Sequence, residues 1–230
     1  MFVNIIIPAR NGSKGIKNKN LEKVGGLPLF ERSINHAIKL SKFFSLKIWI
    51  STDIPSLFNY KNSFKNLVIH KRDKKLCGDK SLTYDVILNL INIYSIPKEE
   101  FIVLFQPTTP FRDPLEVRNA INSLEKESSF NSVVSLSDVC GNHPYRMKKI
   151  TKENEIIDFM GQDFENMMPR QSLPKVYIRS GSFYISRVSS IIKDNSLLPK
   201  PCKGIVHKEQ KYAINIDSEI DLLIANKFNE

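Results

Sequence analysis

A group of cationic side chains near the start of the sequence could bind phosphate. The group lies among two glycines, Gly12 and Gly15, so the backbone can turn tightly there and approach a ligand closely. Its cations are Arg10, Lys14, Lys17 and Lys19. This composition suits a polyphosphate, although the glycines match neither the GxGxxG nor the GxxxxGK[ST] spacing. A solvated turn is the alternative interpretation.

Polar residues also follow two later apolar runs, and each of them has a structural alternative. Thr52 and Asp53 follow the run at 47–51 and could take part in catalysis or cap a helix. Gln106 follows the run at 101–105, and the two prolines after it would hold this glutamine in a rigid loop. Arg112 lies in the same loop and could equally be a structural residue of the helix that follows.

The elements that must position these side chains alternate between strands and helices. The apolar run that begins at Phe2 reads as a strand buried on both faces, which Pro8 should end. The pattern predicts further strands at 47–51, 66–70, 101–105 and 131–137, with 101–105 in the centre, and helices at 29–42, from about 84 and from Pro114. This order predicts an α/β fold with a mostly parallel, Rossmann-like nucleotide-binding sheet. The basic loop would then lie at the carboxyl end of the first strand, where such sheets bind ligands.

The alternation stops after residue 138. Short extended pieces separated by polar turns fill 139–185, which we interpret as an inserted β-rich lobe. The predicted domains are therefore an α/β domain at 1–138 and 186–230 and an inserted lobe at 139–185.

Composition limits the classes of protein to consider. The 230 residues carry a net charge of +10, but the lysines are scattered, so a nucleic-acid-binding tract is weakly supported. No apolar run is long enough to span a membrane, and the N-terminal run lacks the flanks of a signal peptide. The three cysteines are far apart and odd in number, which fits reduced thiols in the cytoplasm.

The opening loop resembles a known family. Residues 8–20 match the pattern Pro-Ala-Arg-x-Gly-Ser-Lys-Gly-x-x-x-Lys-Asn at every fixed position, which is the opening signature of the CMP-sialic acid synthetases, the cytidylyltransferases of nonulosonic acids. The resemblance implies that Arg10 and Lys19 contact the phosphates of CTP and are catalytic. It also implies that the rest of the loop binds the nucleotide, namely Gly12, Ser13, Lys14 and Asn20.

Two further motifs resemble that family. Arg72, Asp79 and Ser81 match the positions that line the cytidine side of the pocket, although Ser81 and Thr83 could instead cap the next helix. The sequence Gln-Pro-Thr-Thr-Pro-Phe-Arg at 106–112 is similar to the family's Gln-Pro-Thr-Ser-Pro-Leu-Arg, which places Gln106 beside the sugar.

The lobe resembles the part of the family that reaches over the partner's active site. Arg-Gln-Ser-Leu-Pro-Lys-Val-Tyr at 170–177 is similar to Arg-Gln-Asp-x-Pro-x-x-Tyr, so Lys148, Arg170 and Tyr177 are expected on the sugar side of a homodimer. Ser172 replaces the family's aspartate, and Ser180 replaces the asparagine of its Asn-Gly pair.

The C-terminal motif is expected to hold the metal. In the family, two aspartates in Asp-Ile-Asp bind the catalytic Mg²⁺, so Mg²⁺ is the expected metal here, with Mn²⁺ as the alternative. Here they correspond to Asn215 and Asp217, which a strand would place on one face. An asparagine offers an oxygen but no charge. Asp217 or Ser218 could also cap the last helix.

Taken together, the resemblance predicts an enzyme that joins CTP and an acidic nine-carbon sugar. The anomeric hydroxyl would attack the α-phosphorus directly and release pyrophosphate, without a covalent intermediate. A cytidylyltransferase of Kdo-like sugars, a nucleotidyltransferase for another base and a basic nucleic-acid-binding protein are the alternatives. No membrane partner is expected, and the sequence does not specify which nonulosonic acid is used.

Overall fold

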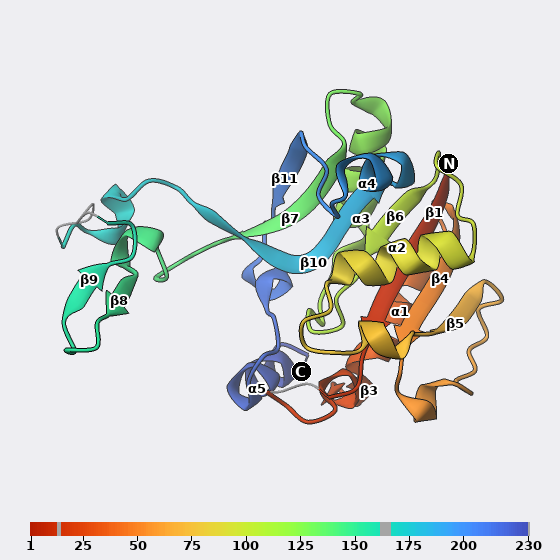
Figure 1. The fold of residues 1–230 in the computed structure, drawn as a ribbon, viewed down its shortest axis with the longest axis horizontal. Coiled ribbons are helices and arrows are strands. Elements are labelled where there is room, and N and C mark those ends of the chain that lie inside the picture. Colours follow the sequence, from red (N-terminus) through yellow and green to blue (C-terminus); the bar gives the residue numbers. More distant parts are fainter. Residues whose placement is uncertain (13–14, 162–166, 230) are drawn as a thin grey trace.

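The computed structural model describes residues 1–12, 15–161 and 167–229, and its core is a sheet of seven strands (Figure 1). Their order across the sheet is β11-β7-β10-β6-β1-β4-β5. Only β10 runs against its neighbours, so the predicted mostly parallel α/β fold is confirmed, with β6 in the centre. The strands are β1 (Phe2–Ala9), β4 (Ser45–Thr52), β5 (Leu67–Lys71), β6 (Phe101–Leu104), β7 (Ser132–Asp138), β10 (Tyr177–Arg187) and β11 (Cys202–Val206).

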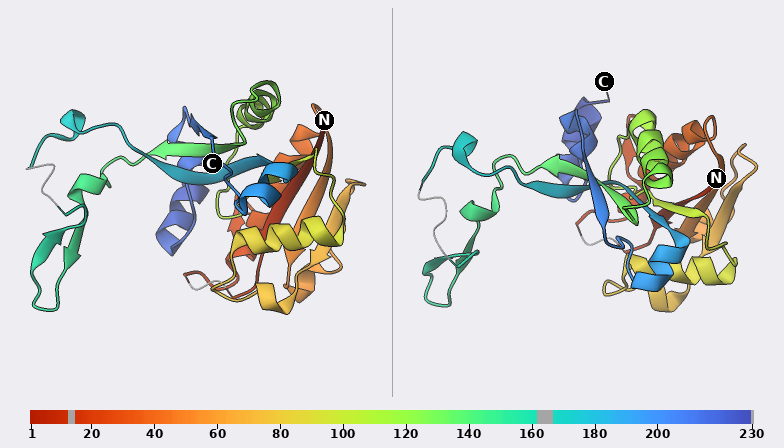
Figure 2. Two further views of the ribbon diagram at one scale, coloured as in Figure 1. Left: turned by 45° about the horizontal axis from the view of Figure 1, so that its top comes forward. Right: turned by 90° about the horizontal axis from the view of Figure 1, so that it is seen from above.

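Helices cover both faces of the sheet. Successive side chains of β1 point to opposite faces, and each face carries its own apolar cluster. Ile5 and Ile7 pack with α1 (Leu29–Leu40) and α3 (Pro114–Lys126). Ile6 packs on the other face, against α2 (Thr83–Ile93) and α4 (Val188–Asp194). The sheet is therefore the middle of three layers, as the two rotated views show (Figure 2).

A third, smaller apolar cluster joins the two ends of the chain. Ile16 from the N-terminal loop packs with Ile216 and with Ala225 of α5 (Glu219–Lys227). The short strands β2 (Lys23–Val24) and β3 (Leu27–Pro28) pair beside this cluster. The packing brings the basic loop next to the segment around Asp217, although some 200 residues separate them in the sequence.

An arm projects from the sheet between β7 and β10 (Figure 1, left). It carries a two-stranded hairpin formed by β8 (Lys148–Ile150) and β9 (Ile156–Asp158). β10 begins at the arm and continues into the sheet, where its last residues pair with β6. The predicted boundary at residue 185 thus lies within β10, and the division into two domains stays a prediction.

Two details differ from the sequence prediction. Pro8 does not end the first strand, because β1 continues beside β4 as far as Ala9. The carbonyl of Ile6, two residues before Pro8, faces β6 and accepts a hydrogen bond from the N–H of Phe105. An N–H at Pro8 would face the same side, but β6 ends at Leu104 and offers no partner there, so proline is tolerated. No strand forms around Asp217: a short 3₁₀ helix at Gln210–Ala213 is followed by irregular backbone.

Among the described residues, no helix is long and apolar enough to cross a membrane.

The remaining short helices are single 3₁₀ turns in the connections. Two of them begin at predicted site residues, Lys19 and Arg170. They span Lys19–Leu21, Pro55–Leu57, Lys74–Leu76, Pro144–Arg146 and Arg170–Ser172.

Candidate active site

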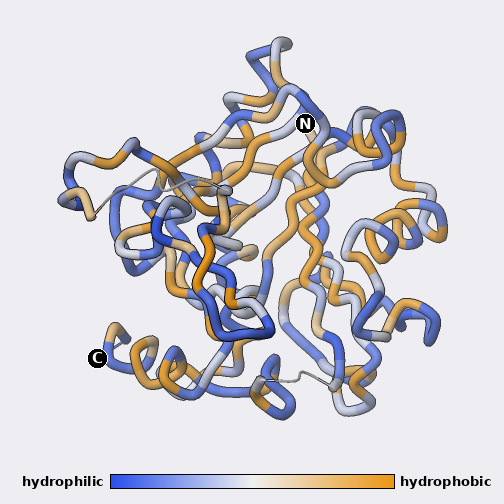
Figure 3. The backbone as a smooth tube through the Cα atoms, turned by 60° about the vertical axis from the view of Figure 1, so that its left-hand side comes forward, coloured by the Kyte–Doolittle hydropathy of each residue, from blue (hydrophilic) through white to orange (hydrophobic). Residues whose placement is uncertain are grey.

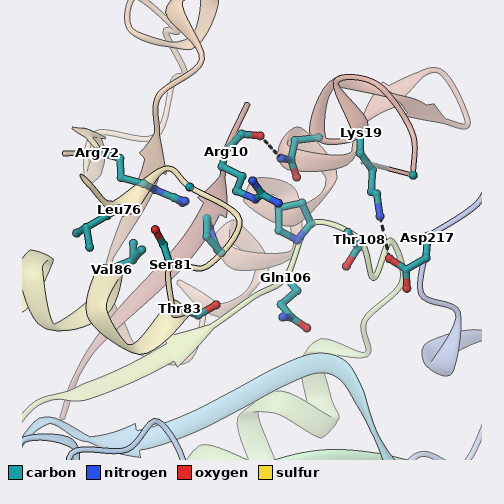
Figure 4. A pocket seen from close by; sticks show the side chains of 15 residues that line it. Arg10, Lys19, Arg72, Leu76, Ser81, Thr83, Val86, Gln106, Thr108 and Asp217 are labelled. Carbon is teal, nitrogen blue, oxygen red and sulfur yellow. Dashed lines mark hydrogen bonds and ion pairs between the residues drawn. The ribbon is translucent and has the colours of Figure 1, made fainter. Parts of the chain in front are cut away.

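A cavity of about 490 Å³ is lined by residues at or after the ends of β1, β5 and β6 (Figure 4). These strands run parallel in one sheet, so the residues that follow them meet at its carboxyl edge. Seven of the predicted site residues line the cavity. They are Arg10, Lys19, Asn20, Arg72, Ser81, Gln106 and Asp217.

Arg10 enters the cavity directly after β1. Its guanidinium pairs with Asp79 at 2.9 Å and keeps a third of its side chain exposed. Asn20 is buried and donates a hydrogen bond to the carbonyl of Arg10 at 2.8 Å. Asp53 accepts a bond from the backbone N–H of Asn11 at 2.7 Å, so it fixes the start of the loop and caps no helix.

Lys19 and Asp217 form an ion pair across the cavity. The Lys19 Nζ lies 2.8 Å from Asp217 Oδ1, and the lysine side chain is only 11% exposed whereas the aspartate is 68% exposed. Asn215 donates from its amide to the other oxygen of the same carboxylate. Ser218, not Asp217, caps α5 and forms a capping box with Asp221. The Asp217 carboxylate is therefore directed at Lys19 and Asn215 rather than at a helix end.

Arg72 supplies a third cation from the end of β5. It is 6% exposed and donates to the carbonyl of Ser51 at 2.8 Å. Burial lowers the pKa of Arg72, but from so high a value that the group stays charged at neutral pH. Ser81 lies nearby and donates to the carbonyl of Lys75. The N-cap of α2 is Leu82, without a side-chain bond, so the alternative that Ser81 or Thr83 caps this helix is wrong.

The charges of this cavity are arranged for an anionic ligand. Arg10, Lys19 and Arg72 all line it, whereas the carboxylates that pair with the first two are 42% exposed in Asp79 and 68% exposed in Asp217. An entering polyphosphate could replace Asp79 and Asp217 as the partners of Arg10 and Lys19. Neither carboxylate would then be left buried and unpaired. Phosphate oxygens also accept bidentate bonds from guanidinium groups.

Comparison with known proteins agrees with this geometry. Residues 4–213 match the family model described as cytidylyltransferase. The chain belongs to the cytidylyltransferase family. It is 28% identical over 218 residues to an N-acylneuraminate cytidylyltransferase of Streptococcus agalactiae serotype V, a match that covers 95% of this chain and 51% of that protein. The chain thus spans about half the length of this curated relative.

Two other matches extend over whole proteins. A CMP-N,N'-diacetyllegionaminic acid synthase of Legionella pneumophila is 28% identical over 232 residues, covering 100% of this chain and 97% of that protein. A solved CMP:2-keto-3-deoxy-manno-octonic acid synthetase complexed with CTP has a TM-score of 0.63, with 99% of this chain and 100% of that chain covered. Its identity is 14%, so it supports the fold alone.

Gln106 lies between two cavities. It lines the cavity described above and a second one of about 410 Å³, which also contains Arg179 and Tyr184 from β10. Arg112 holds the loop from behind: it is 3% exposed, donates to the carbonyls of Gln106 and Ser182, and its pKa is lowered to about 9 by burial. Arg112 is thus a structural residue.

The predicted sugar-side residues of the arm do not line the cavity within one chain. Lys148 pairs with Asp158 inside the hairpin, and Arg170 lines a separate cavity in the arm. Tyr177 is exposed at the start of β10. Gly12 is exposed outside the cavity, and Ser13 and Lys14 lie outside the described residues.

One glycine of the loop has a role that the sequence prediction missed. Gly15 lines the cavity, and a Cβ added to it would lie 2.3 Å from the backbone oxygen of Asp217. Only glycine lets the loop come this close to Asp217. The Gly-x-x-Gly spacing was visible in the sequence, but the partner of the second glycine lies far away in the chain. Arg179 and Tyr184 were missed because they lie in a strand, where no loop signal marks them.

Proposed function

We propose that this protein transfers the cytidylyl group of CTP to an acidic nine-carbon 2-keto sugar, which yields a CMP-sugar and pyrophosphate. The observation that carries the proposal is the cavity lined by three cations, at the carboxyl ends of parallel strands, in a member of the cytidylyltransferase family. The names of the streptococcal and Legionella relatives support a nonulosonic acid as the acceptor.

The two cavities fit the two reactants. The phosphates of CTP would bind Arg10 and Lys19, and the sugar would occupy the second cavity, where Arg179 offers a cation to its carboxylate. Gln106 lies between them, so the anomeric hydroxyl would approach the α-phosphorus from the Gln106 side while pyrophosphate leaves toward the basic loop. A P–O bond to the sugar forms as the P–O bond to pyrophosphate breaks, and the hydroxyl proton passes to solvent. This chain contributes positioning and charge neutralisation.

The residues at Asp217 suit a hard cation that is shared with the substrate. One carboxylate and one amide lie side by side, and Mg²⁺ in nucleotide enzymes often takes one or two carboxylates with phosphate oxygens and water. Among the described residues, no group of three His, Cys, Asp or Glu side chains could hold a metal alone. Asp217 and Asn215 would therefore hold Mg²⁺ together with CTP, and the bound ion would neutralise phosphate charge.

The arm supports a two-fold homodimer as the active species. Its hairpin exposes large apolar side chains such as Ile150 and Ile156, and an isolated two-stranded hairpin is marginally stable in water. The hydropathy view shows apolar residues along it (Figure 3). Lys148 and Arg170 lie on this arm away from their own cavity, so they can contribute to sugar binding only in a second copy, as a two-fold axis would arrange for both subunits.

Pyrophosphate release tests the proposal. Purified protein with CTP and Mg²⁺ should release pyrophosphate in the presence of sialic, legionaminic or pseudaminic acid, and should do so poorly with ATP, GTP or UTP. Activity with the eight-carbon acid Kdo but none of the nine-carbon acids would replace the proposed acceptor. Absence of release with every acid and nucleotide would overturn the proposed function.

A further inference from the structure

Three side chains, from α3, β10 and the segment after β11, form a hydrogen-bonded relay. Glu116 of α3 contacts His207, which follows β11, with 2.6 Å between Oε2 and Nδ1. His207 Nε2 in turn lies 2.8 Å from the hydroxyl oxygen of Ser180 on β10. The His207 side chain is 1% exposed and that of Glu116 is 15% exposed. The relay therefore joins α3, β10 and the segment after β11.

The bond to Ser180 holds in either charge state of the imidazole. The carboxylate of Glu116 can only accept, so Nδ1 carries a proton and donates to it. A hydroxyl has one proton, so Ser180 accepts from a protonated Nε2 while it donates to Ser135, or donates to an unprotonated Nε2 while Ser135 donates to it. Ser180 also contacts the hydroxyl of Ser135 at 2.7 Å. Its oxygen accepts from the backbone N–H of Ser182 at 3.3 Å.

Ser180 fixes the backbone on which Gln106 rests. The pairing of β10 with β7 shifts register between Arg179 and Tyr184, and Gly181 in this irregular stretch has a φ of +83°. A Cβ at Gly181 would lie 2.7 Å from Gln106 Oε1, so the glutamine packs directly against the glycine backbone. A displacement of this stretch would move the amide of Gln106, which borders both cavities.

Serine, histidine and a carboxylate in this order also form the nucleophilic relays of hydrolases. Ser180 borders a cavity of about 220 Å³, but it is only 5% exposed and its hydroxyl oxygen already contacts His207, Ser135 and the Ser182 amide. The relay is therefore built to hold a conformation.

We propose that His207 is a positioning residue of the transfer reaction: oriented by Glu116, it holds Ser180 and thereby the Gly181 stretch that sets Gln106 against the sugar. The expected changes in KM rest on the proposed function. The structural part of the inference, the hold on the Gly181 backbone, can be measured without substrate.

Steady-state kinetics of three variants test the consequence. His207→Phe keeps the ring packing against Phe183 and Tyr212 but removes both hydrogen bonds, whereas His207→Gln keeps a donor and an acceptor. Ser180→Ala removes only the last link. His207→Phe and Ser180→Ala should raise KM for the acid about tenfold, the cost of one lost hydrogen bond at its upper end, and change KM for CTP less than about twofold. His207→Gln should restore most of the parent value.

Ser132→Ala is the matched control, since Ser132 is also a buried serine with a 2.7 Å hydrogen bond but lies at the far end of β7, in neither cavity. It should leave both KM values at those of the parent. A merely structural role for His207 would lower the amount of folded enzyme and leave both KM values unchanged. Unchanged KM for the acid in His207→Phe and Ser180→Ala, or an equal rise for both substrates, would overturn the positioning role.

Amide hydrogen exchange supplies a readout independent of activity. The Ser182 amide, which donates to Ser180 Oγ, should exchange about tenfold faster in His207→Phe and at the parent rate in His207→Gln, because the hydroxyl stays fixed only in the latter. An unchanged rate in His207→Phe would overturn the proposed hold on the backbone. If the parent transfers no cytidylyl group, the proposed function fails, and the exchange rates still decide what His207 holds.

Discussion

Lys19 is held in place by its surroundings rather than by its charge alone. Its side chain is almost buried, and its ammonium group faces a carboxylate that is mostly exposed. The lysine can therefore keep its position while its partner changes from Asp217 to a phosphate. A preorganised cation of this kind stabilises charge that develops on a leaving group without having to move at the moment of reaction.

Lys19→Met is expected to separate activity from stability. Removal of the cation should lower kcat about 10²-fold to 10³-fold, the range seen when one preorganised group that stabilises developing charge is removed. The ion pair with exposed Asp217 should contribute at most about 1 kcal/mol to the free energy of unfolding. Pyrophosphate release and urea unfolding measure the two effects.

Lys23→Met, an exposed lysine outside the cavity, is the control for that pair of measurements and should change neither. If Lys19→Met lost activity only in proportion to its loss of folded protein, the proposed contact of Lys19 with phosphate would be wrong.

The Asp217 and Asn215 pair predicts opposite responses to two single changes. Asp217→Asn would leave two amides and no anionic oxygen, so activity at ordinary Mg²⁺ concentrations should be lost. Asn215→Asp should lower the Mg²⁺ concentration for half-maximal rate, since a second carboxylate is added beside the first. Mn²⁺ should partly rescue the parent at low metal concentration, because it binds oxygen ligands similarly and Mg²⁺ demands a more rigid octahedral shell.

A metal titration of pyrophosphate release compares the three proteins. Since Asp217→Asn also removes the ion pair of Lys19, Lys19→Met serves as the control that has lost the pair but keeps the carboxylate. Retention of the parent's Mg²⁺ dependence in Asp217→Asn would mean that CTP and other groups hold the metal.

At the scale of elements, the basic loop depends on its contact with the segment before α5. Ile16 packs on Ile216, whose backbone N–H donates to the carbonyl of Thr108 at 2.8 Å. Three loops from distant parts of the sequence thus meet at the cavity, and Gly15 is the point where two of them touch.

Gly15→Ala is expected to push the loop and the Asp217 segment apart. A methyl group 2.3 Å from a backbone oxygen cannot be accommodated by rotation of a side chain, so Lys19 and Asp217 should separate and the catalytic rate should fall at least about tenfold. Thermal unfolding should change less than activity, since the loop lies at the edge of the core. Gly141→Ala, where a Cβ meets nothing within 4 Å, is the matched control. Parent activity in Gly15→Ala would show that the contact is not needed.

Much of this arrangement could be predicted from local patterns. Continuous apolar runs located β1, β4 and β6, and the rule that ligands bind at carboxyl ends located Arg10 and Gln106. The alternation of Asn215, Ile216 and Asp217 resembled a strand because Ile216 is fully buried and the polar residues flank it. A strand needs a neighbour to pair with, and here a single bond to Thr108 takes its place. Partners that are distant in the sequence, such as Asp217 for Gly15, leave no local signal.

At the scale of the whole molecule, the arm is the feature that a single chain does not explain. Its strands expose Ile150 at 72% and Ile156 at 67%, in a hairpin that has no core of its own. The proposed dimer would bury these side chains against the second copy and bring Lys148 and Arg170 to the other cavity.

Ile150→Glu together with Ile156→Glu should therefore convert a dimer to a monomer at micromolar concentrations. Two charges placed in a desolvated interface would each cost several kcal/mol. The α/β core should stay folded, which circular dichroism can verify, while KM for the acid rises. Sedimentation velocity measures the mass, and Lys152→Glu, an exposed charge change in the same hairpin turn, is the control. A parent that sediments as a monomer would remove the contribution of Arg170 in trans.

β10 connects two sites, because the strand that leaves the arm also carries Gly181 beneath Gln106. Subunit association and acid binding should accordingly be thermodynamically linked. If the dimer binds the acid more tightly than the monomer does, saturating acid must lower the dissociation constant of the dimer. Each of the two bound acid molecules lowers it by the ratio of the dimer's affinity for the acid to the monomer's affinity. Sedimentation equilibrium with and without the acid measures this reciprocity. The concentration of the enzyme would then set its apparent affinity for the sugar, so that dilution alone could act as an inhibitor.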